Sequence, residues 1–191
     1  MIELIFIRHG QTDWNLEKRL QGIQDIPLNQ TGREEAERLT SSFNISVNSI
    51  TSSPLSRAYE TAEILNKKLG LNIYSDRRLV ERDFGELSGK SVDYSKTVNR
   101  DLFGVESIHS MESKISSFLK DMEKLTQGTH IVVTHGGVIN ILLNMLSEGE
   151  LNWENTPIHN CSLTSIIFDS SWNINYYGSK EFMLTEEIFI V

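Results

Sequence analysis

Residues 129–146 read Thr-His-Ile-Val-Val-Thr-His-Gly-Gly-Val-Ile-Asn-Ile-Leu-Leu-Asn-Met-Leu. The β-branched run at 131–133 predicts a buried strand, and the apolar stretch over 138–146 predicts a helix that follows a turn at two glycines. The chain begins in the same way, because an apolar strand predicted over 2–7 leads directly into Arg8-His9-Gly10. Two predicted strands therefore end beside a histidine that is followed by glycine.

Three further helices are predicted from their start signals and their periodicity. Thr31 and Glu34 match a capping box, which predicts a helix up to about residue 43. Ser53 as N-cap with Pro54 as the first helical residue predicts a second helix, which ends at a glycine at position 70. Apolar residues that recur every three or four positions from Ile108 predict a third helix, which a glycine at position 128 closes.

Short apolar stretches before Ser53 and at 71–74 predict additional strands, and three more are expected at 162–168, 173–177 and 183–191. A long polar connection covers 79–105, and long connections in compact domains are often functional. Strands that alternate with helices are typical of crossover units. We therefore expect an α/β fold, a three-layer α/β/α sandwich with a mostly parallel central sheet, formed by a single domain over 1–191.

The chain has 191 residues, a formal net charge of −8 at pH 7 and a single cysteine. An acidic chain is a poor ligand for nucleic-acid phosphates, so we expect no nucleic-acid partner. One cysteine forms neither an internal disulfide nor a cysteine zinc site, which favours a reducing cytoplasm. The first apolar run is too short for a signal peptide, and no stretch reaches the ~18 apolar residues of a membrane span, so we expect no membrane partner. The oligomeric state stays open.

Ligands of open α/β sheets bind at the carboxyl ends of the strands, where His9 and His135 are expected. The fixed positive charge of Arg8 disfavours a metal ion there and favours an anion. Arg57 falls in the first turn of a predicted helix, where free amides and the helix dipole add to its attraction for phosphate. Glu81 supplies a carboxyl group just after a strand. Each residue alone is as readily structural as functional, so only their combination indicates a phosphate site.

These residues belong to a longer set of motifs that covers most of the chain. In order along the sequence the set comprises Arg8-His9-Gly10-x-Thr12-x-x-Asn15, Gln21-Gly22 with Asp25, Pro27-Leu28, Thr31-Gly32, Ser53-Pro54-Leu55-x-Arg57-Ala58-x-x-Thr61-Ala62, Glu81-x-x-Phe84-Gly85, Gly104-x-Glu106-Ser107 and Val133-x-His135-Gly136-Gly137. It resembles the histidine phosphatase superfamily, in its phosphoglycerate mutase-like branch. The first tripeptide alone is a weak signal, whereas the ordered set is a strong one.

The resemblance implies a reaction at phosphorus that needs neither a metal nor another cofactor. His9 would attack as a neutral imidazole and form a phosphohistidine, while a backbone carbonyl holds its other ring nitrogen. Arg8, Arg57 and a protonated His135 would surround the phosphate oxygens, so the surroundings of the two histidines are expected to push their pKa values apart. Glu81 would protonate the leaving oxygen and then activate water. The remaining phosphate ligands would be Asn15, Gln21, Gly22 and Gly136.

The acceptor of the phosphoryl group separates a phosphatase from a mutase in this family. A mutase holds a phosphoglycerate carboxylate with paired arginines on a long insertion, whereas residues 89–106 form a short segment whose basic residues are only Lys90, Lys96 and Arg100. We therefore expect a phosphomonoesterase that acts on small phosphorylated metabolites. The alternatives are a bisphosphoglycerate-primed phosphoglycerate mutase and a catalytically silent phosphate-binding module. Leu87-Ser88-Gly89 stands where many relatives have Trp-Glu-Gly, which leaves the substrate preference open.

Several other residues that attract notice are expected to be structural. His130 and His159 match no position of the family, and we expect them to pack or to be solvated. Trp14 could line the mouth of the site, whereas Trp153 is expected to pack against the protein. Asn160 begins a glycosylation pattern that has no meaning without a secretory signal.

Overall fold

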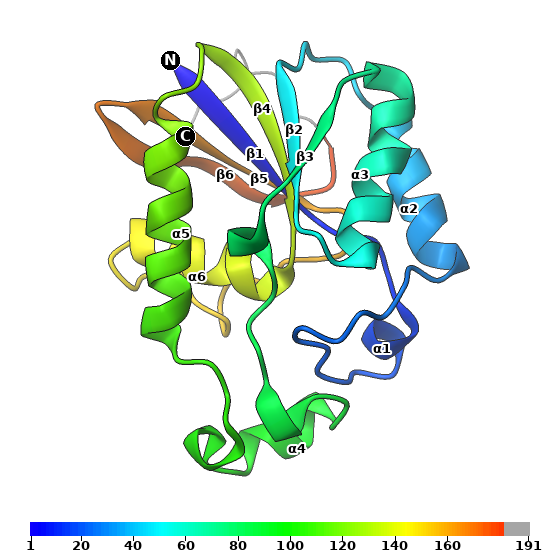
Figure 1. The fold of residues 1–191 in the computed structure, drawn as a ribbon, viewed down its shortest axis with the longest axis vertical. Coiled ribbons are helices and arrows are strands. Elements are labelled where there is room, and N and C mark those ends of the chain that lie inside the picture. Colours follow the sequence, from blue (N-terminus) through cyan, green and yellow to red (C-terminus); the bar gives the residue numbers. More distant parts are fainter. Residues whose placement is uncertain (182–191) are drawn as a thin grey trace.

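The computed structural model of the protein describes residues 1–181, and the strand expected over 183–191 lies outside the described residues. Figure 1 shows how the elements follow one another along the chain. With η for a 3₁₀ helix, they are β1 (Ile2–Arg8), α1 (Asp13–Leu16), α2 (Gln30–Ser41), β2 (Ser49–Ser52), α3 (Ser56–Leu69), β3 (Ile73–Ser75), η1 (Arg77–Leu79), η2 (Gly85–Leu87), α4 (Val92–Lys96), η3 (Arg100–Phe103), α5 (Ile108–Met122), β4 (Gly128–Thr134), α6 (Gly136–Leu146), β5 (Leu163–Asp169) and β6 (Ser171–Ser179).

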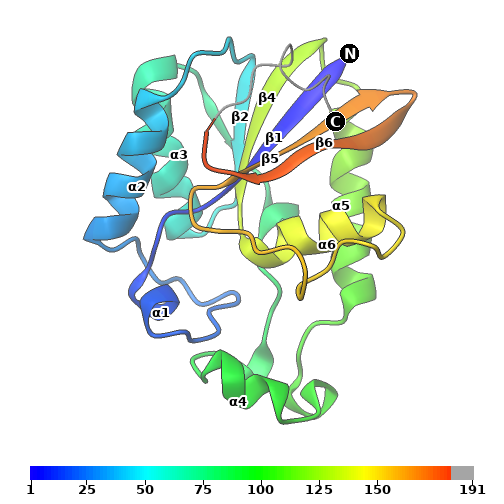
Figure 2. The ribbon, with the colours of Figure 1, turned by 180° about the vertical axis from the view of Figure 1, so that it is seen from behind.

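The strands form one six-stranded sheet in the order β3-β2-β4-β1-β5-β6. The first four in this order are mutually parallel; β5 pairs antiparallel with β1, and β6 pairs antiparallel with β5 at the edge of the sheet. Helices α2 and α3 cover one face of the sheet and α5 and α6 cover the other, so the predicted α/β sandwich is confirmed (Figures 1 and 2). Because Arg8 of β1 is aligned with Thr134 of β4, the parallel strands end together at the lower edge of the sheet in Figure 1.

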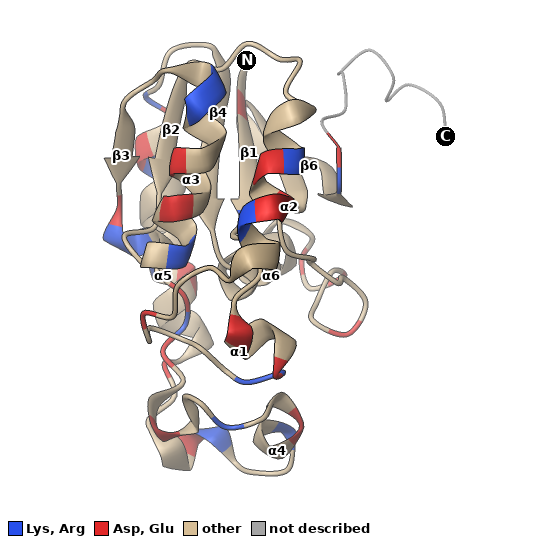
Figure 3. Ribbon diagram, turned by 90° about the vertical axis from the view of Figure 1, so that its right-hand side faces the viewer, with Lys and Arg blue, Asp and Glu red and all other residues tan. Residues whose placement is uncertain are grey.

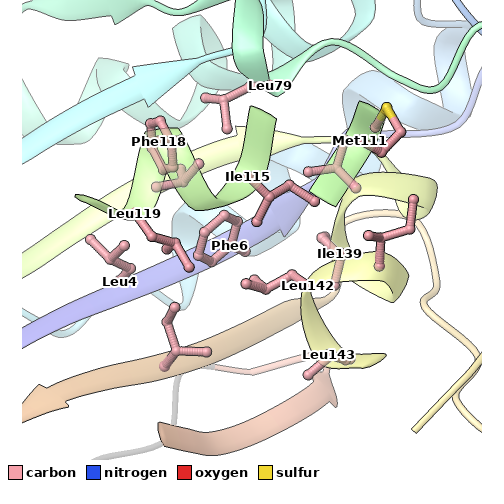
Figure 4. Packing of buried hydrophobic residues seen from close by; sticks show 14 of the residues in the cluster. Leu4, Phe6, Leu79, Met111, Ile115, Phe118, Leu119, Ile139, Leu142 and Leu143 are labelled. Carbon is pink, nitrogen blue, oxygen red and sulfur yellow. The ribbon is translucent and has the colours of Figure 1, made fainter. Parts of the chain in front are cut away.

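Side chains of β1 alternate between two cores because both faces of the sheet are covered. Leu4 and Phe6 pack in the cluster formed with α5 and α6, whereas Ile5 and Ile7 pack in the cluster formed with α2 and α3. Figure 4 shows the first cluster, in which the ring of Phe6 meets that of Phe118 edge-on with 6.4 Å between centroids. Full burial of such a side chain stabilises the fold by roughly 1.5–3 kcal/mol. The two cores therefore fix the strands whose ends carry the predicted site.

Two helices begin at positions that differ from the prediction. The N-cap of α2 is Asn29, so the capping box expected from Thr31 and Glu34 is wrong. Helix α3 begins two residues later than expected, after Leu55, and no side chain caps it locally. The carboxylate of Asp25, from a distant loop, instead accepts a hydrogen bond from the first helical amide of α3 at 2.7 Å. A tertiary contact thus replaces the local cap that Ser53 and Pro54 suggested.

The long connection predicted over 79–105 contains short helical segments rather than an extended loop. We call residues 88–104, which include α4 and η3, the cap; they lie beyond the carboxyl edge of the sheet (Figure 2). A small apolar cluster, separate from the two main cores, joins the cap to the rest of the protein; Val92, Val98 and Phe103 belong to the cap, and Leu20, Phe84, Leu87 and Val105 lie outside it. The cap therefore has little apolar contact with the sheet.

In the ribbon of Figure 3, acidic and basic residues are interspersed along the helices. Within residues 1–181, no helix is both long and apolar enough to span a bilayer. Cys161 is a free thiol, and it is buried in the cluster beside α2 and α3 as expected for a small core residue.

Candidate active site

His9 follows β1 directly and is almost completely buried. Its backbone amide donates to the Thr134 carbonyl at 3.0 Å, which continues the pairing of β1 and β4 past their last residues. The ring Nδ1 lies 2.7 Å from the carbonyl oxygen of Gly10 and donates to it, so Nε2 carries the lone pair. Arg57 Nε donates to this Nε2 at 3.2 Å, a contact that requires a neutral imidazole.

The surroundings of His9 also favour the neutral ring electrostatically. Burial lowers the pKa of His9 well below its ordinary value of 6.5, and the charges of Arg57 and Arg8 lower it further. Burial is thus the largest cause of the low pKa of His9, and the two arginines add to it.

Arg57 lies in the first turn of α3 and is completely buried. Besides the contact with His9, Nη1 donates to the Gln24 carbonyl and Nη2 to the Gly22 carbonyl, both at 2.7 Å. Burial lowers the pKa of Arg57 to about 10, so the side chain stays charged at neutral pH. The guanidinium of Arg57 thus connects Nε2 of His9 to the loop that follows α1.

Arg8 is the last residue of β1, and its side chain extends toward the segment before β5. Nη1 donates to the Ile158 carbonyl at 2.6 Å, while Nε is buried and has no partner among the described residues. Burial lowers the pKa of Arg8, and the nearby charge of Glu81 opposes that effect. The unpaired Nε is a donor that the oxygen of an anion could satisfy.

Glu81 lies at the N-terminal end of α6, where it is held by backbone amides. The Gly137 amide donates to Oε2 at 3.0 Å, and the Arg82 amide donates to Oε1 at 2.9 Å. A β-carbon added at position 137 would overlap Oε1, so the glycine there lets the carboxylate approach the helix. Upstream of Glu81, the Thr134 hydroxyl at the end of β4 donates to the Leu79 carbonyl at 2.7 Å and ties this segment to the sheet.

His135 follows β4 and is completely buried, with its ring 5.2 Å from that of His9 between centroids. Nε2 lies 2.8 Å from the Ser53 hydroxyl, and Nδ1 has no partner among the described residues. Burial lowers the pKa of His135 well below 6.5, and Arg57, His9 and Arg8 add to the shift. The expectation that the two histidines have pKa values pushed apart is wrong for the free protein, because both rings share one buried, positively charged site.

The loop after β1 carries the remaining predicted ligands. Thr12 caps α1, and its hydroxyl accepts from the Asn15 amide at 3.2 Å while the Asn15 carboxamide oxygen accepts from the Thr12 amide at 3.1 Å. The same hydroxyl lies 3.0 Å from Gln21 Oε1. Gly22 has a positive φ of 56°, a conformation that glycine adopts without strain. This local network places Asn15 and Gln21 on one wall of the site.

These elements surround a cavity of about 270 Å³. Every predicted site residue lines it except His135, whose ring packs edge-on against that of His9; the predicted residues on its wall are Arg8, His9, Asn15, Gln21, Gly22, Arg57, Glu81 and Gly136. A larger hollow of about 550 Å³ lies between α2 and residues 159–161, and none of the predicted site residues lines it. The convergence of histidine, arginine and glutamate therefore identifies the smaller cavity as the candidate active site. Among the described residues, no group of three or more histidine, cysteine or acidic side chains could hold a metal ion.

Asn160 was missed by the sequence reasoning. Its Nδ2 donates to the His9 carbonyl at 2.9 Å and lies 3.4 Å from Asn15 Oδ1. The next amide, of Cys161, donates to the Arg8 carbonyl at 3.0 Å. The antiparallel pairing of β5 with β1 brings this segment to the end of β1 from about 150 residues away, so no local pattern could have indicated it.

Two tryptophans are placed differently from the prediction. Trp153 is half exposed, at 53 %, and lines the cavity instead of packing away from it. Trp14 does not line the cavity; its ring lies 4.3 Å from the Arg19 guanidinium, and Arg19 itself is on the cavity wall. Trp153 and Arg19, neither of which was predicted to line the site, are thus part of its wall.

Comparison with known proteins agrees with this geometry. A sequence profile described as histidine phosphatase superfamily (branch 1) matches residues 4–178. The chain is 33% identical over 184 residues to an uncharacterized phosphatase, PhoE, of Bacillus subtilis strain 168, covering 93% of this chain and 95% of that protein. It is 29% identical over 190 residues to a probable phosphoglycerate mutase, GpmB, of Salmonella paratyphi A, covering 90% and 88% of the two chains.

A solved structure, that of a mycobacterial glucosyl-3-phosphoglycerate phosphatase in complex with VO3, is similar with a TM-score of 0.82 and 27% identity over 93% of this chain and 98% of that one. The matches extend over nearly the whole chain and include the strand ends that carry His9 and His135. The protein is therefore a member of branch 1 of the histidine phosphatase superfamily.

Proposed function

We propose that the protein is a phosphomonoesterase that hydrolyses small phosphorylated metabolites through a phosphohistidine on His9. The observation that carries the proposal is the pair of contacts on the His9 ring. Nδ1 is committed to the Gly10 carbonyl, and Nε2 keeps its lone pair beside Arg57 in the cavity. A neutral imidazole with one oriented lone pair is the form that attacks phosphorus.

Binding of the substrate phosphate is proposed to use the donors that converge on the cavity. Arg8 Nε lacks a protein partner, and Arg57 Nε exchanges its contact with His9 for one with a phosphate oxygen. The dianionic phosphate raises the pKa of His135, so this ring takes up a proton as the substrate binds. The site then holds the transferring group mainly by position and charge, which is what phosphoryl transfer requires.

The first chemical step forms the bond between His9 Nε2 and phosphorus and breaks the ester P–O bond. Glu81 donates its proton to the leaving oxygen, so the alcohol departs neutral. In the second step the Glu81 carboxylate takes a proton from water as the water oxygen attacks phosphorus. The N–P bond breaks, inorganic phosphate leaves, and His9 and protonated Glu81 are both restored.

A mutase would return the phosphoryl group to a phosphoglycerate and would need cations for its carboxylate. Several relatives carry a mutase name, which keeps this second candidate in view. None of the basic residues of the cap, Lys90, Lys96 and Arg100, lines the cavity. Arg19 is the one cation at its mouth among the described residues, and its Nε and Nη1 are already bonded to the Gly89 carbonyl and to Glu17. This arrangement favours water as the acceptor.

We place this activity in the cytoplasm, because the single buried thiol of Cys161 suits a reducing compartment. No metal or organic cofactor enters the proposed steps. The histidine and glutamate side chains supply the nucleophile and the proton.

The test is to incubate the protein, with a chelator present, with an aryl phosphate and separately with 3-phosphoglycerate plus a bisphosphoglycerate primer. Release of phosphate from the aryl ester supports the phosphatase, and isomerisation of the phosphoglycerate supports the mutase. Binding of phosphate by calorimetry without turnover of either ester would indicate the silent module.

His9→Ala is the decisive variant because it removes the nucleophile without changing the strand pairing. We expect it to abolish activity while the circular dichroism spectrum stays that of the native protein. The native protein should form an alkali-stable, acid-labile phosphoprotein when quenched during turnover. Full activity of the His9→Ala variant would contradict the mechanism.

A further inference from the structure

Asn140 is a polar residue in the apolar helix α6, and 4 % of its surface is exposed. Its Nδ2 donates to the Gly136 carbonyl at 3.0 Å. This contact settles the orientation of the side chain, because a carbonyl oxygen accepts a hydrogen bond only from the NH2 end of the amide. The other end, Oδ1, is buried without a hydrogen-bond partner among the described residues.

A buried acceptor without a partner costs free energy and is rare in folded proteins. Asn144, one turn further along α6, shows the ordinary arrangement, since it is half-buried, donates to the Leu151 carbonyl at 2.9 Å and does not line the cavity. Asn140 lines the cavity of the active site. The residue that carries this unpaired oxygen is therefore part of the wall of a cavity in which a ligand can supply the missing donor.

Asn140 also lies on the Glu81 side of the cavity. Its carboxamide is bonded to the Gly136 carbonyl, and the next residue, Gly137, donates its amide to Glu81. In the proposed mechanism Glu81 protonates the leaving oxygen, so the alcohol part of the substrate lies beside this first turn of α6. The buried Thr156 and Ile158 also line the cavity.

We infer that Asn140 Oδ1 accepts a hydrogen bond from a hydroxyl group on the alcohol part of the substrate, so the preferred substrates are phosphate monoesters of small polyhydroxy alcohols. This inference rests on the proposed phosphomonoesterase function. A carboxylate at this place has no proton to donate and is repelled by Oδ1. An ammonium group could donate, but the charges of Arg8 and Arg57 disfavour it in the same cavity. A neutral hydroxyl avoids both repulsions.

The experiment compares kcat/KM of the native protein for glycerol 3-phosphate and for propyl phosphate, which differ only in their hydroxyl groups. We expect glycerol 3-phosphate to be favoured by about tenfold, because the ester without hydroxyls leaves the buried oxygen unpaired. 3-Aminopropyl phosphate tests the ammonium donor and is expected to react no faster than propyl phosphate.

Asn140→Leu removes the acceptor at similar size, and it is expected to lower the ratio of the two kcat/KM values to about one. Asn144→Leu is the matched control, because it replaces the same residue type on the same helix away from the cavity, and it should leave the ratio at the native value. A ratio that survives Asn140→Leu would overturn the inference.

The native protein alone also decides the question, whether or not Asn140→Leu folds. Equal hydrolysis of glycerol 3-phosphate and propyl phosphate would overturn this inference and leave the phosphomonoesterase function standing. A preference for the aminopropyl ester over glycerol 3-phosphate would overturn the choice of a hydroxyl. No phosphate release from any ester, aryl phosphate included, would overturn the proposed function and the inference together.

Discussion

The floor of the cavity and the cap over it are held in different ways. In the floor, Arg57 is completely buried and its three guanidinium nitrogens each have a partner. The cap instead joins the protein at its margin, where the Leu20 amide donates to the Lys90 carbonyl at 2.9 Å and the Gly89 amide donates to the Leu20 carbonyl at 2.7 Å. The small apolar cluster that contains Leu87 adds to this attachment.

The floor and the cap therefore serve different purposes: the floor carries out the proposed reaction, and the cap affects the access of substrate to it. The floor supplies the groups proposed to act on phosphorus, and the strands that carry them are fixed by two main cores. Within the cap, Val92 lines the cavity. Elements with few buried apolar contacts open at low free energy, so we expect changes in the cap to alter substrate access and changes in the floor to alter the reaction itself.

The largest effect is expected from Gly137→Ala in the floor. The new methyl group would overlap Glu81 Oε1 and push the carboxylate away from the leaving oxygen. Because a positioned general acid contributes roughly 10²- to 10⁴-fold, kcat should fall within that range while the melting temperature changes little. Gly136→Ala is the comparison, since its methyl group would lie 3.4 Å from Arg8 Nε, and its loss of kcat should be much smaller. Equal losses would argue against this role of Glu81.

Arg57→Gln should come next in size, because it removes a buried positive charge from the floor. Loss of a charged donor for the phosphate should cost about 10²- to 10³-fold in kcat. Removal of the same charge raises the pKa of His9, so at a given acidic pH less of the ring is neutral and the acid limb of kcat/KM moves to higher pH. Arg57→Lys keeps the charge and should lower activity without moving the limb. If the acid limb of kcat/KM lay at the same pH in both variants, the charge of Arg57 would not be a cause of the low pKa of His9.

A third comparison uses one fully buried leucine from the main core and one from the cluster next to the cap. Leu142→Ala, in the main core beside α5, should lower the free energy of unfolding by about 3 kcal/mol. Leu87→Ala, in the cluster next to the cap, should cost less in global unfolding and raise KM instead, because the cap opens locally. Urea denaturation and steady-state kinetics measure the two quantities. Similar losses of stability with unchanged KM would show that the cap is not a separate unit.

The last comparison concerns pH and the buried histidines of the floor. His9 and His135 stay neutral in the folded protein, whereas the unfolded chain takes up protons below the ordinary pKa of 6.5. Stability is therefore fully present above that pH and is lost as the pH falls below it, by about 1.4 kcal/mol per pH unit for each ring. Urea unfolding between about pH 7 and 5 should show this slope, and His135→Asn should reduce it by about half. An unchanged slope would contradict a neutral, buried His135.

Much of the floor was predictable because it depends on local pattern and on one general property of parallel sheets. Apolar runs that end in His9 and His135 identify two strands, and parallel strands end at one edge. Arg57 is in the first turn of α3, as its distance from Pro54 suggested, although the helix begins two residues later. The cap was predicted only as a polar connection, since its short helices have too few residues for a periodic signal.

The sequence by itself determined the alternation of strands and helices, the family, and most of the residues proposed to act on phosphorus, because each of these depends on short motifs of neighbouring residues. Only the tertiary structure decided that Asn160 supports His9, that Trp153 lines the mouth and that Asn140 keeps an unpaired oxygen. The charge state of His135 in the free protein was decided there too, because burial and the charges of distant residues set a pKa and depend on contacts between segments far apart in the chain.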